Sequence, residues 1–225
     1  MQQKNLFEQT LTSLSQHEIL NDLVLIGGWC FIVYREHFGN SHLIPVLRTL
    51  DIDFLIPTPV KRSNTADLPA VLSNLGFDLA IAYPDGVEKY VHPELELEFM
   101  VPARGEAVEK VEFVRKLGVK AQPLRYMSLL VENIMVTRFR GIELRVPRPS
   151  VFAIHKLIVS TYRKVPEKRK RDEESALSLL QFCKKVPSEW ILAVHTCDTM
   201  PTGWFQRVAG VLERLDSVLL KNLKG

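Results

Sequence analysis

The feature that most constrains the fold is a pair of aspartates inside an apolar segment. Asp51 and Asp53 stand in DIDFLI, residues 51–56, which otherwise has the composition of a buried strand. Side chains two residues apart on a strand point to the same side, so both carboxylates are predicted to project together while Ile52 and Phe54 face the core. Two adjacent carboxylates repel, and a divalent cation such as Mg²⁺ relieves that repulsion. Taken alone, the pattern also fits a solvated strand face.

A glycine pair precedes this segment and changes its interpretation. Gly27 and Gly28 follow the short apolar run LVLI, residues 23–26, and come directly before a segment with helical spacing, residues 29–38. A turn from strand to helix offers bare backbone N–H groups and the positive end of a helix to a phosphate. A phosphate-binding turn and a carboxylate pair are complementary parts of one site.

A second acidic strand is predicted further along the chain. In ELELEFMV, residues 94–101, the glutamates alternate with apolar residues and therefore share one face. One of Glu94, Glu96 and Glu98 supplies a third carboxylate if this strand lies beside the aspartate strand. A solvent-facing acidic edge strand explains each glutamate equally well.

The remaining pattern predicts an α/β unit followed by a helical unit. Helices are predicted at 6–20, 29–38 and 66–77, strands at 23–28, 51–56, 77–83, 87–92 and 94–101, and a hairpin at 134–146. After Pro149 the expected elements are helices at 150–164, 172–185, 188–197 and 203–220. We therefore expect an α/β domain over 1–148 and a helical domain over 149–225.

Composition excludes several classes of protein. The chain has 225 residues, 46% hydrophobic and 24% charged, with a net charge of +3, which is ordinary for a globular protein. It has no apolar run of the length that spans a bilayer and no signal-peptide pattern at its start, so no membrane partner and a cytoplasmic location are expected. Its three cysteines and scattered histidines do not have zinc-site spacing. The basic run RKVPEKRKR, residues 163–171, fits either an RNA-binding surface or a solvated linker.

The motifs together resemble the nucleotidyltransferase superfamily, whose best-known member is DNA polymerase beta. The shared order is a strand, Gly-Gly opening a helix, Asp-x-Asp in an apolar strand, and a carboxylate in a later strand. The helical segment resembles that of minimal bacterial nucleotidyltransferases and of abortive-infection toxins, in which a Lys-Leu pair, an arginine and a basic-Asp pair recur. Here these are Lys156-Leu157, Arg163 and Arg171-Asp172. The chain departs from the commoner pattern with Gly28 instead of serine and with Ser175 where some toxins have a second aspartate.

The resemblance implies an α/β (α+β) fold in which a mixed β-sheet nucleotidyltransferase core with flanking helices is followed by a C-terminal helical unit. It also implies a metal site and a triphosphate site. Mg²⁺ (or Mn²⁺) would be held by Asp51 and Asp53, with Glu98 as third ligand and proton acceptor and Glu96 as the runner-up. The residues implied to contact the nucleotide are Gly27, Gly28, Arg48, Thr49, Lys156 and Arg163.

The function that follows is transfer of a nucleoside monophosphate from a nucleoside triphosphate to an acceptor, which is RNA, a protein or a small molecule. The alternative is a protein that keeps the fold and has lost turnover, either an antitoxin-like binding module or an RNA-binding regulator. A partner protein or a homo-oligomer is compatible with either function.

Overall fold

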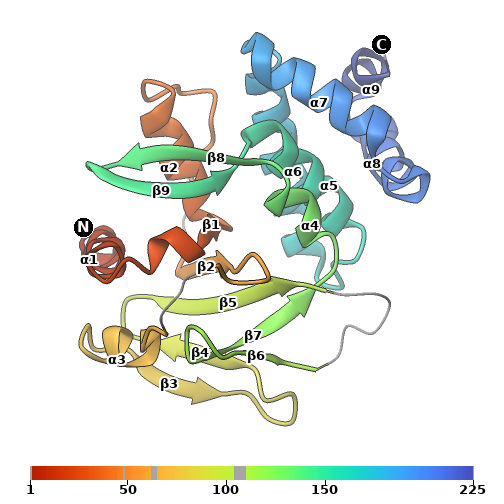
Figure 1. Ribbon diagram of the computed structural model, residues 1–225. Coiled ribbons are helices and arrows are strands. Elements are labelled where there is room, and N and C mark those ends of the chain that lie inside the picture. The colour runs from red at the N-terminus through yellow and green to blue at the C-terminus, as the bar shows by residue number, and fades with distance from the viewer. Residues whose placement is uncertain (1, 48, 62–64, 104–109, 225) are drawn as a thin grey trace. The chain divides into compact units, whose positions relative to one another are not determined.

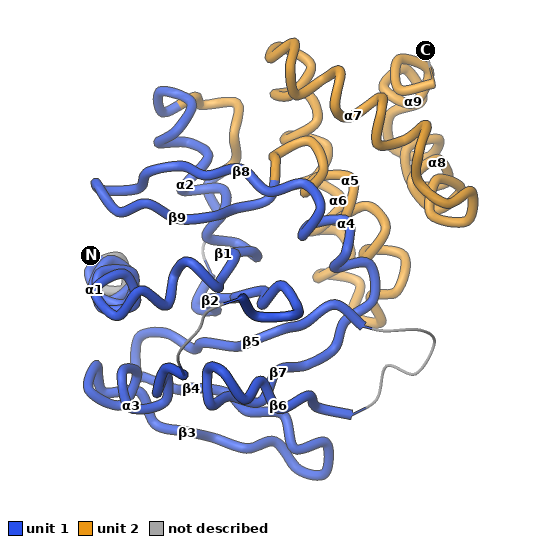
Figure 2. Tube along the Cα trace, viewed as in Figure 1, with its two compact units in different colours: residues 1–40, 46–147 blue, residues 41–45, 148–225 orange. Residues whose placement is uncertain are grey.

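The computed structural model describes residues 2–47, 49–61, 65–103 and 110–224 of the chain. Contacts divide it into two compact units, shown in different colours in Figure 2. Unit 1 comprises residues 1–40 and 46–147, and unit 2 comprises residues 41–45 and 148–225. Two compact units need not fold independently, so the division into domains 1–148 and 149–225 stays a prediction.

Unit 1 is a mixed α/β structure (Figure 1). Its helices are α1 (Gln2–Gln16), the 3-10 turn η1 (Leu20–Asp22), α2 (Trp29–His37), α3 (Leu68–Ser73) and α4 (Met127–Val131). Its strands are β1 (Val24–Ile26), β2 (Asp51–Leu55), β3 (Asp78–Ile81), β4 (Glu88–Val91), β5 (Glu96–Pro102), β6 (Glu112–Val114), β7 (Val119–Leu124), β8 (Ile134–Phe139) and β9 (Ile142–Pro147).

The main sheet is mixed and has the strand order β1-β2-β5-β4-β3. Strands β2 and β5, side by side in Figure 1, are parallel, whereas β1 pairs with β2 and β4 pairs with β5 in antiparallel fashion. The later part of β5 leaves β4 and pairs with β7, which in turn pairs with β6. Strands β8 and β9 form a separate hairpin, as the sequence predicts. The mixed sheet with flanking helices confirms the expected fold class.

One face of the central strands forms the core. Ile52 and Phe54 are fully buried, and Phe54 stacks on its register partner Phe99 with ring centroids 6.1 Å apart. Trp29, at the start of α2, stacks on Phe7 of α1 at 3.8 Å and is 3% exposed. Trp29 is therefore part of the core, and α1 supports the segment in which the glycine turn lies.

Unit 2 is built from helices, as the pattern after Pro149 predicts. They are α5 (Pro149–Ser160), α6 (Pro166–Cys183), α7 (Pro187–Thr199), α8 (Thr202–Leu215) and α9 (Ser217–Leu223). Proline stands at a first helical position of α5, α6 and α7, where its missing N–H costs no hydrogen bond.

Two boundaries in unit 2 differ from the sequence-based expectation. Helix α6 begins at Pro166 instead of Asp172, so most of the basic run is helical. The expected final helix is two helices, because the Asp216 carboxylate accepts a hydrogen bond from the Leu219 N–H and caps α9. Among the helices in the described part of the chain, none has the length and apolar character needed to cross a bilayer.

Candidate active site

The glycine turn lies where β1 ends and α2 begins. Gly27 has φ +73°, a conformation that side chains rarely adopt. A Cβ at residue 27 would overlap Asp53 Oδ2 and lie 2.9 Å from Asp53 Cγ. Asp53 is thus packed directly against the turn, which brings the carboxylate strand and the predicted phosphate-binding backbone together.

Thr49 packs against the second glycine of the turn. A Cβ at residue 28 would lie 2.7 Å from Thr49 Cγ2 and 3.2 Å from Thr49 Oγ1. The same hydroxyl accepts a hydrogen bond from the Asp51 N–H at 3.3 Å. Thr49 thus fills the space that a side chain at residue 28 would occupy, which favours glycine at this position. Arg48, which was expected to act beside Thr49, lies outside the described residues.

The two acidic strands are aligned residue for residue. In the parallel pairing of β2 with β5, Asp51 is the partner of Glu96 and Asp53 is the partner of Glu98. Register partners on neighbouring strands project to the same face, so the four carboxylates share the face opposite Phe54 and Phe99. The alternation predicted from the sequence produces this face.

Lys89 of β4 binds the predicted third carboxylate. It is the register partner of Glu98 in the antiparallel pairing of β4 with β5 and forms an ion pair with it. Its ammonium also lies 3.4 Å from Glu96 Oε2. The hydrogen bond to Glu98, opposed by partial burial, raises the pKa of Lys89 above its usual value. No local sequence pattern singles out Lys89, because only the β4–β5 register places its side chain beside that of Glu98.

The donors on this face suit a hard divalent cation in chemical type. Such ions prefer carboxylate oxygens, and Asp51, Asp53 and Glu98 project from neighbouring strands beside a turn that only glycine fits. In the described ranges, however, no group of three or more histidine, cysteine, aspartate or glutamate side chains is already arranged to hold a metal ion. Since Glu98 is engaged by Lys89, its side chain must turn to join the two aspartates.

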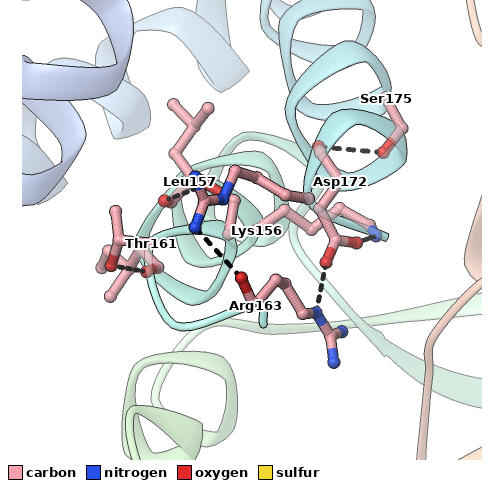
Figure 3. Close-up of polar contacts among 9 residues, drawn as sticks. Lys156, Leu157, Thr161, Arg163, Asp172 and Ser175 are labelled. Carbon is pink, nitrogen blue, oxygen red and sulfur yellow. Dashed lines mark hydrogen bonds and ion pairs between the residues drawn. The ribbon is translucent and has the colours of Figure 1, made fainter. Parts of the chain in front are cut away.

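Unit 2 contains a cluster of the residues that the helical motif singled out (Figure 3). Lys156 Nζ of α5 donates to Asp172 Oδ1 of α6 at 2.7 Å, and Arg163 Nε donates to Asp172 Oδ2 at 2.8 Å. The side chains of Lys156 and Asp172 are 13% and 10% exposed, whereas Arg163 is 43% exposed. Ser175 Oγ donates to the backbone carbonyl of Asp172 at 3.1 Å. Asp172, whose role the sequence left open, holds the two cations together.

Charge and burial oppose each other within this cluster. Burial alone would raise the pKa of Asp172, but Lys156 and Arg163 outweigh it and hold the pKa below its usual value. The adjacent His155 is buried, and desolvation, reinforced by Lys156, lowers its pKa to about 3. At neutral pH the cluster therefore contains one buried carboxylate, two cations and a neutral imidazole.

A shallow hollow of about 330 Å³ lies elsewhere in unit 1. It is lined by residues of α3 and its flanks and by Leu79 and Tyr90 of β3 and β4. Tyr90 is adjacent to Lys89 on β4 and thus points to the opposite face of the sheet. The hollow is therefore not part of the carboxylate face.

The chain is similar to known proteins in sequence family and in fold. The family model described as nucleotidyltransferase matches residues 6–192. No curated protein matches the chain. An antigenic nucleotidyltransferase-like protein from Paracoccidioides brasiliensis has a solved structure with a TM-score of 0.53 and 16% identity, over 97% of this chain and 92% of that one. The structure of ANT(2'')-Ia in complex with adenylyl-2''-tobramycin has a TM-score of 0.47 and 14% identity, over 95% of this chain and 99% of that one.

These comparisons differ in what they show. The likeness to the Paracoccidioides protein shows a shared fold. The family match extends over most of the chain and includes the glycine turn, both aspartates, Glu98 and the Lys156 helix. The chain belongs to the nucleotidyltransferase family.

Proposed function

We propose that this chain is an enzyme that transfers a nucleoside monophosphate from a nucleoside triphosphate to an acceptor, in a reaction that depends on Mg²⁺ or Mn²⁺. The observation that supports it best is the alignment of Asp53 with Glu98, in neighbouring parallel strands, beside the turn at Gly27. Such a transfer needs carboxylates to hold a metal and groups that bind phosphate, and the proposal is supported by the packing of Asp53 against the turn to which we assign the phosphates.

The carboxylates of the site have distinct roles in this proposal. Asp51 and Asp53 would hold the metal, whose chemistry when bound would be to neutralise charge on the triphosphate and to activate the attacking oxygen. Glu98 completes the ligand set and accepts the proton of the acceptor's attacking hydroxyl. Glu96 is the less suitable candidate because its side chain is 41% exposed, against 18% for Glu98.

The cationic and backbone groups bind the triphosphate. The N–H groups of Gly27 and Gly28 stand at the start of α2, where the helix dipole favours a phosphate. We assign Thr49 and Arg48 to the same ligand. We also assign Lys156 and Arg163 to its phosphates, and the support for this is that Asp172 fixes the two cations side by side within unit 2.

We further propose RNA as the acceptor class, which an exposed run of basic side chains supports. Lys164, Lys168, Arg169, Lys170 and Arg171 are all exposed, so the basic run forms a cationic surface at the start of α6. Exposed lysine and arginine clusters attract the phosphate backbone of nucleic acids without regard to sequence. A binding module that has lost turnover would use the same surface, and only an assay of transfer separates the two functions.

The test uses triphosphates labelled at either the α- or the γ-phosphate, with Mg²⁺ and separate RNA, protein and small-molecule fractions as acceptors. Nucleotidyl transfer moves the α-label into one fraction and leaves the γ-label in released pyrophosphate. Transfer of the γ-label would instead identify a kinase. Retention of both labels in intact triphosphate, with every base and every fraction, would support the binding module.

A further inference from the structure

Glu98 lies between a carboxylate and a cation. A single row of register partners crosses the sheet of unit 1, and its members, from β1 to β3, are Ile26, Asp53, Glu98, Lys89 and Ala80. Neighbouring strands are about 4.8 Å apart, so Asp53 and Lys89 stand at similar distances on opposite sides of Glu98. A Glu98 carboxylate directed toward one of them is directed away from the other.

In this structure Glu98 is engaged by Lys89. The ammonium pairs with Glu98 and also approaches Glu96 to 3.4 Å, so it neutralises part of the repulsion among the carboxylates of this face. This pairing is consistent with the absence, within the part of the chain that the structure describes, of three or more such side chains already grouped for a metal.

We propose that Lys89 is an internal counter-ion that holds Glu98 away from Asp53 and competes with the divalent cation for this third carboxylate. Metal binding must displace the ammonium from Glu98, and the positive charge of Lys89 also opposes the approach of the metal. Lys89 is therefore a positioning residue that weakens cation binding in the absence of triphosphate and keeps the carboxylate face stable while it is empty. This inference rests on the proposed function, because it takes the carboxylate face to be the metal site.

Lys120 provides a matched control. It too is a strand lysine paired with a glutamate, since its Nζ lies 3.3 Å from Glu88 Oε1, and its side chain is 42% exposed, against 38% for Lys89. Glu88 precedes Lys89 on β4 and thus points to the opposite face of the sheet. Loss of the Lys120 charge leaves the carboxylate face unchanged.

The experiment is calorimetric titration of the full-length protein with Mn²⁺ alone. We expect Lys89→Met to bind Mn²⁺ at least about tenfold more tightly than the parent, because the variant loses both the charge and the competing ion pair. Lys120→Met and Lys89→Arg should bind as the parent does. In a protein that already carries Glu98→Gln, Lys89→Met should not increase the affinity for Mn²⁺, because the carboxylate with which Lys89 pairs is then missing.

Thermal melting gives a second readout that does not depend on catalysis. Without metal, Lys89→Met should melt at a lower temperature than the parent, and Mn²⁺ should raise its melting temperature by more. If the parent binds Mn²⁺ and Lys89→Met binds it equally well or more weakly, the inference is wrong and the proposed function still stands. Tighter binding by Lys89→Arg also overturns it. Absence of Mn²⁺ binding in the parent and in Lys89→Met contradicts both.

Discussion

Asp53 occupies the space that a side chain at residue 27 would need. Its Oδ2 would overlap a Cβ built there, and its Cγ would lie 2.9 Å from that atom. Because the backbone of Gly27 also has φ +73°, glycine is required at this position by both space and conformation. The turn at the end of β1 and the acidic strand β2 are thus fitted to each other.

The first prediction follows from this fit. Gly27→Ala should destabilise the protein by more than the roughly 1–3 kcal/mol of a strained backbone alone, because Asp53 must also move. It should weaken triphosphate binding as well, since the displaced carboxylate is a proposed metal ligand. Urea denaturation and calorimetric titration with triphosphate measure the two effects.

Gly141→Ala is the control for backbone strain. Gly141 has φ +81° and no atom within 4 Å of an added Cβ, so this variant carries the strain without the collision. Gly141→Ala should lose only the roughly 1–3 kcal/mol of stability that backbone strain costs, and it should bind triphosphate as the parent does. Equal losses of stability in the two variants would mean that contact with Asp53 has no energetic importance.

The second prediction separates the two glutamates of β5. Glu98→Gln should reduce nucleotidyl transfer by at least about a hundredfold, the lower range for loss of a proton-transfer group, whereas Glu96→Gln should stay within a few fold of the parent. The difference arises because Glu98 is aligned with Asp53, which packs against the turn. Steady-state transfer rates measure it, and a larger loss in Glu96→Gln would reverse the assignment.

The third prediction concerns Asp172. Asp172→Asn leaves Lys156 and Arg163 without their carboxylate and should cost about 3 kcal/mol at pH 7. The pKa of Asp172 is lower in the folded protein than its unfolded value of 3.8. The stabilisation by the ionised carboxylate is therefore fully present above pH 3.8 and is lost as the pH falls through the folded-state pKa. Urea denaturation at a series of pH values should therefore show the difference from the parent shrinking below about pH 4.

Glu174 supplies the control on the same helix. It pairs with Lys170 at 3.7 Å, and both side chains are exposed. Exposed pairs contribute little, so Glu174→Gln should change the free energy of unfolding by less than about 1 kcal/mol. A difference between parent and Asp172→Asn that does not vary with pH would show that the charge of Asp172 is not what stabilises the cluster.

The fourth prediction tests RNA as the acceptor. The first variant replaces Lys168, Arg169 and Lys170 with glutamine. In a plot of the logarithm of the binding constant for single-stranded RNA against the logarithm of salt concentration, its slope should be shallower than that of the parent by about 2. Its affinity for triphosphate should be unchanged. The control replaces Lys184 and Lys185, which are exposed at the other end of α6. An unchanged slope in the first variant, or an equal change in the control, would exclude this surface as an RNA-binding site.

The sequence predicts the parts of this fold whose signal is local. Alternation in residues 51–56 and 94–101 predicts both acidic strands and the burial of Ile52 and Phe54. The glycine pair predicts the turn into α2. In these segments the side-chain period is set by neighbouring residues, so a single sequence suffices to assign it.

Pairings over long sequence separations could not be predicted in the same way. The register that aligns Asp53 with Glu98 joins residues 45 positions apart, and a shift by one residue would turn the glutamates to the other face. The ion pairs of Lys89 with Glu98 and of Asp172 with Arg163 depend likewise on packing that no local pattern specifies. The sequence pattern predicts no element between residues 103 and 133, where β6, β7 and α4 lie, because these short segments have no strong period.

The most direct test of the proposed function is metal-dependent triphosphate binding by the variant that carries both Asp51→Asn and Asp53→Asn. The comparison variant, Asp78→Asn with Asp85→Asn, removes the same charge from unit 1 outside the proposed ligand set. We predict that the parent and the comparison variant bind triphosphate with Mg²⁺ far more tightly than with EDTA. The Asp51 and Asp53 variant should lose this difference while melting at the same or a higher temperature, since it lacks a repelling pair. Two results would contradict a metal site at Asp51 and Asp53. One is that triphosphate binding by this variant depends on Mg²⁺ as strongly as binding by the parent does. The other is that the parent binds triphosphate equally well with Mg²⁺ and with EDTA.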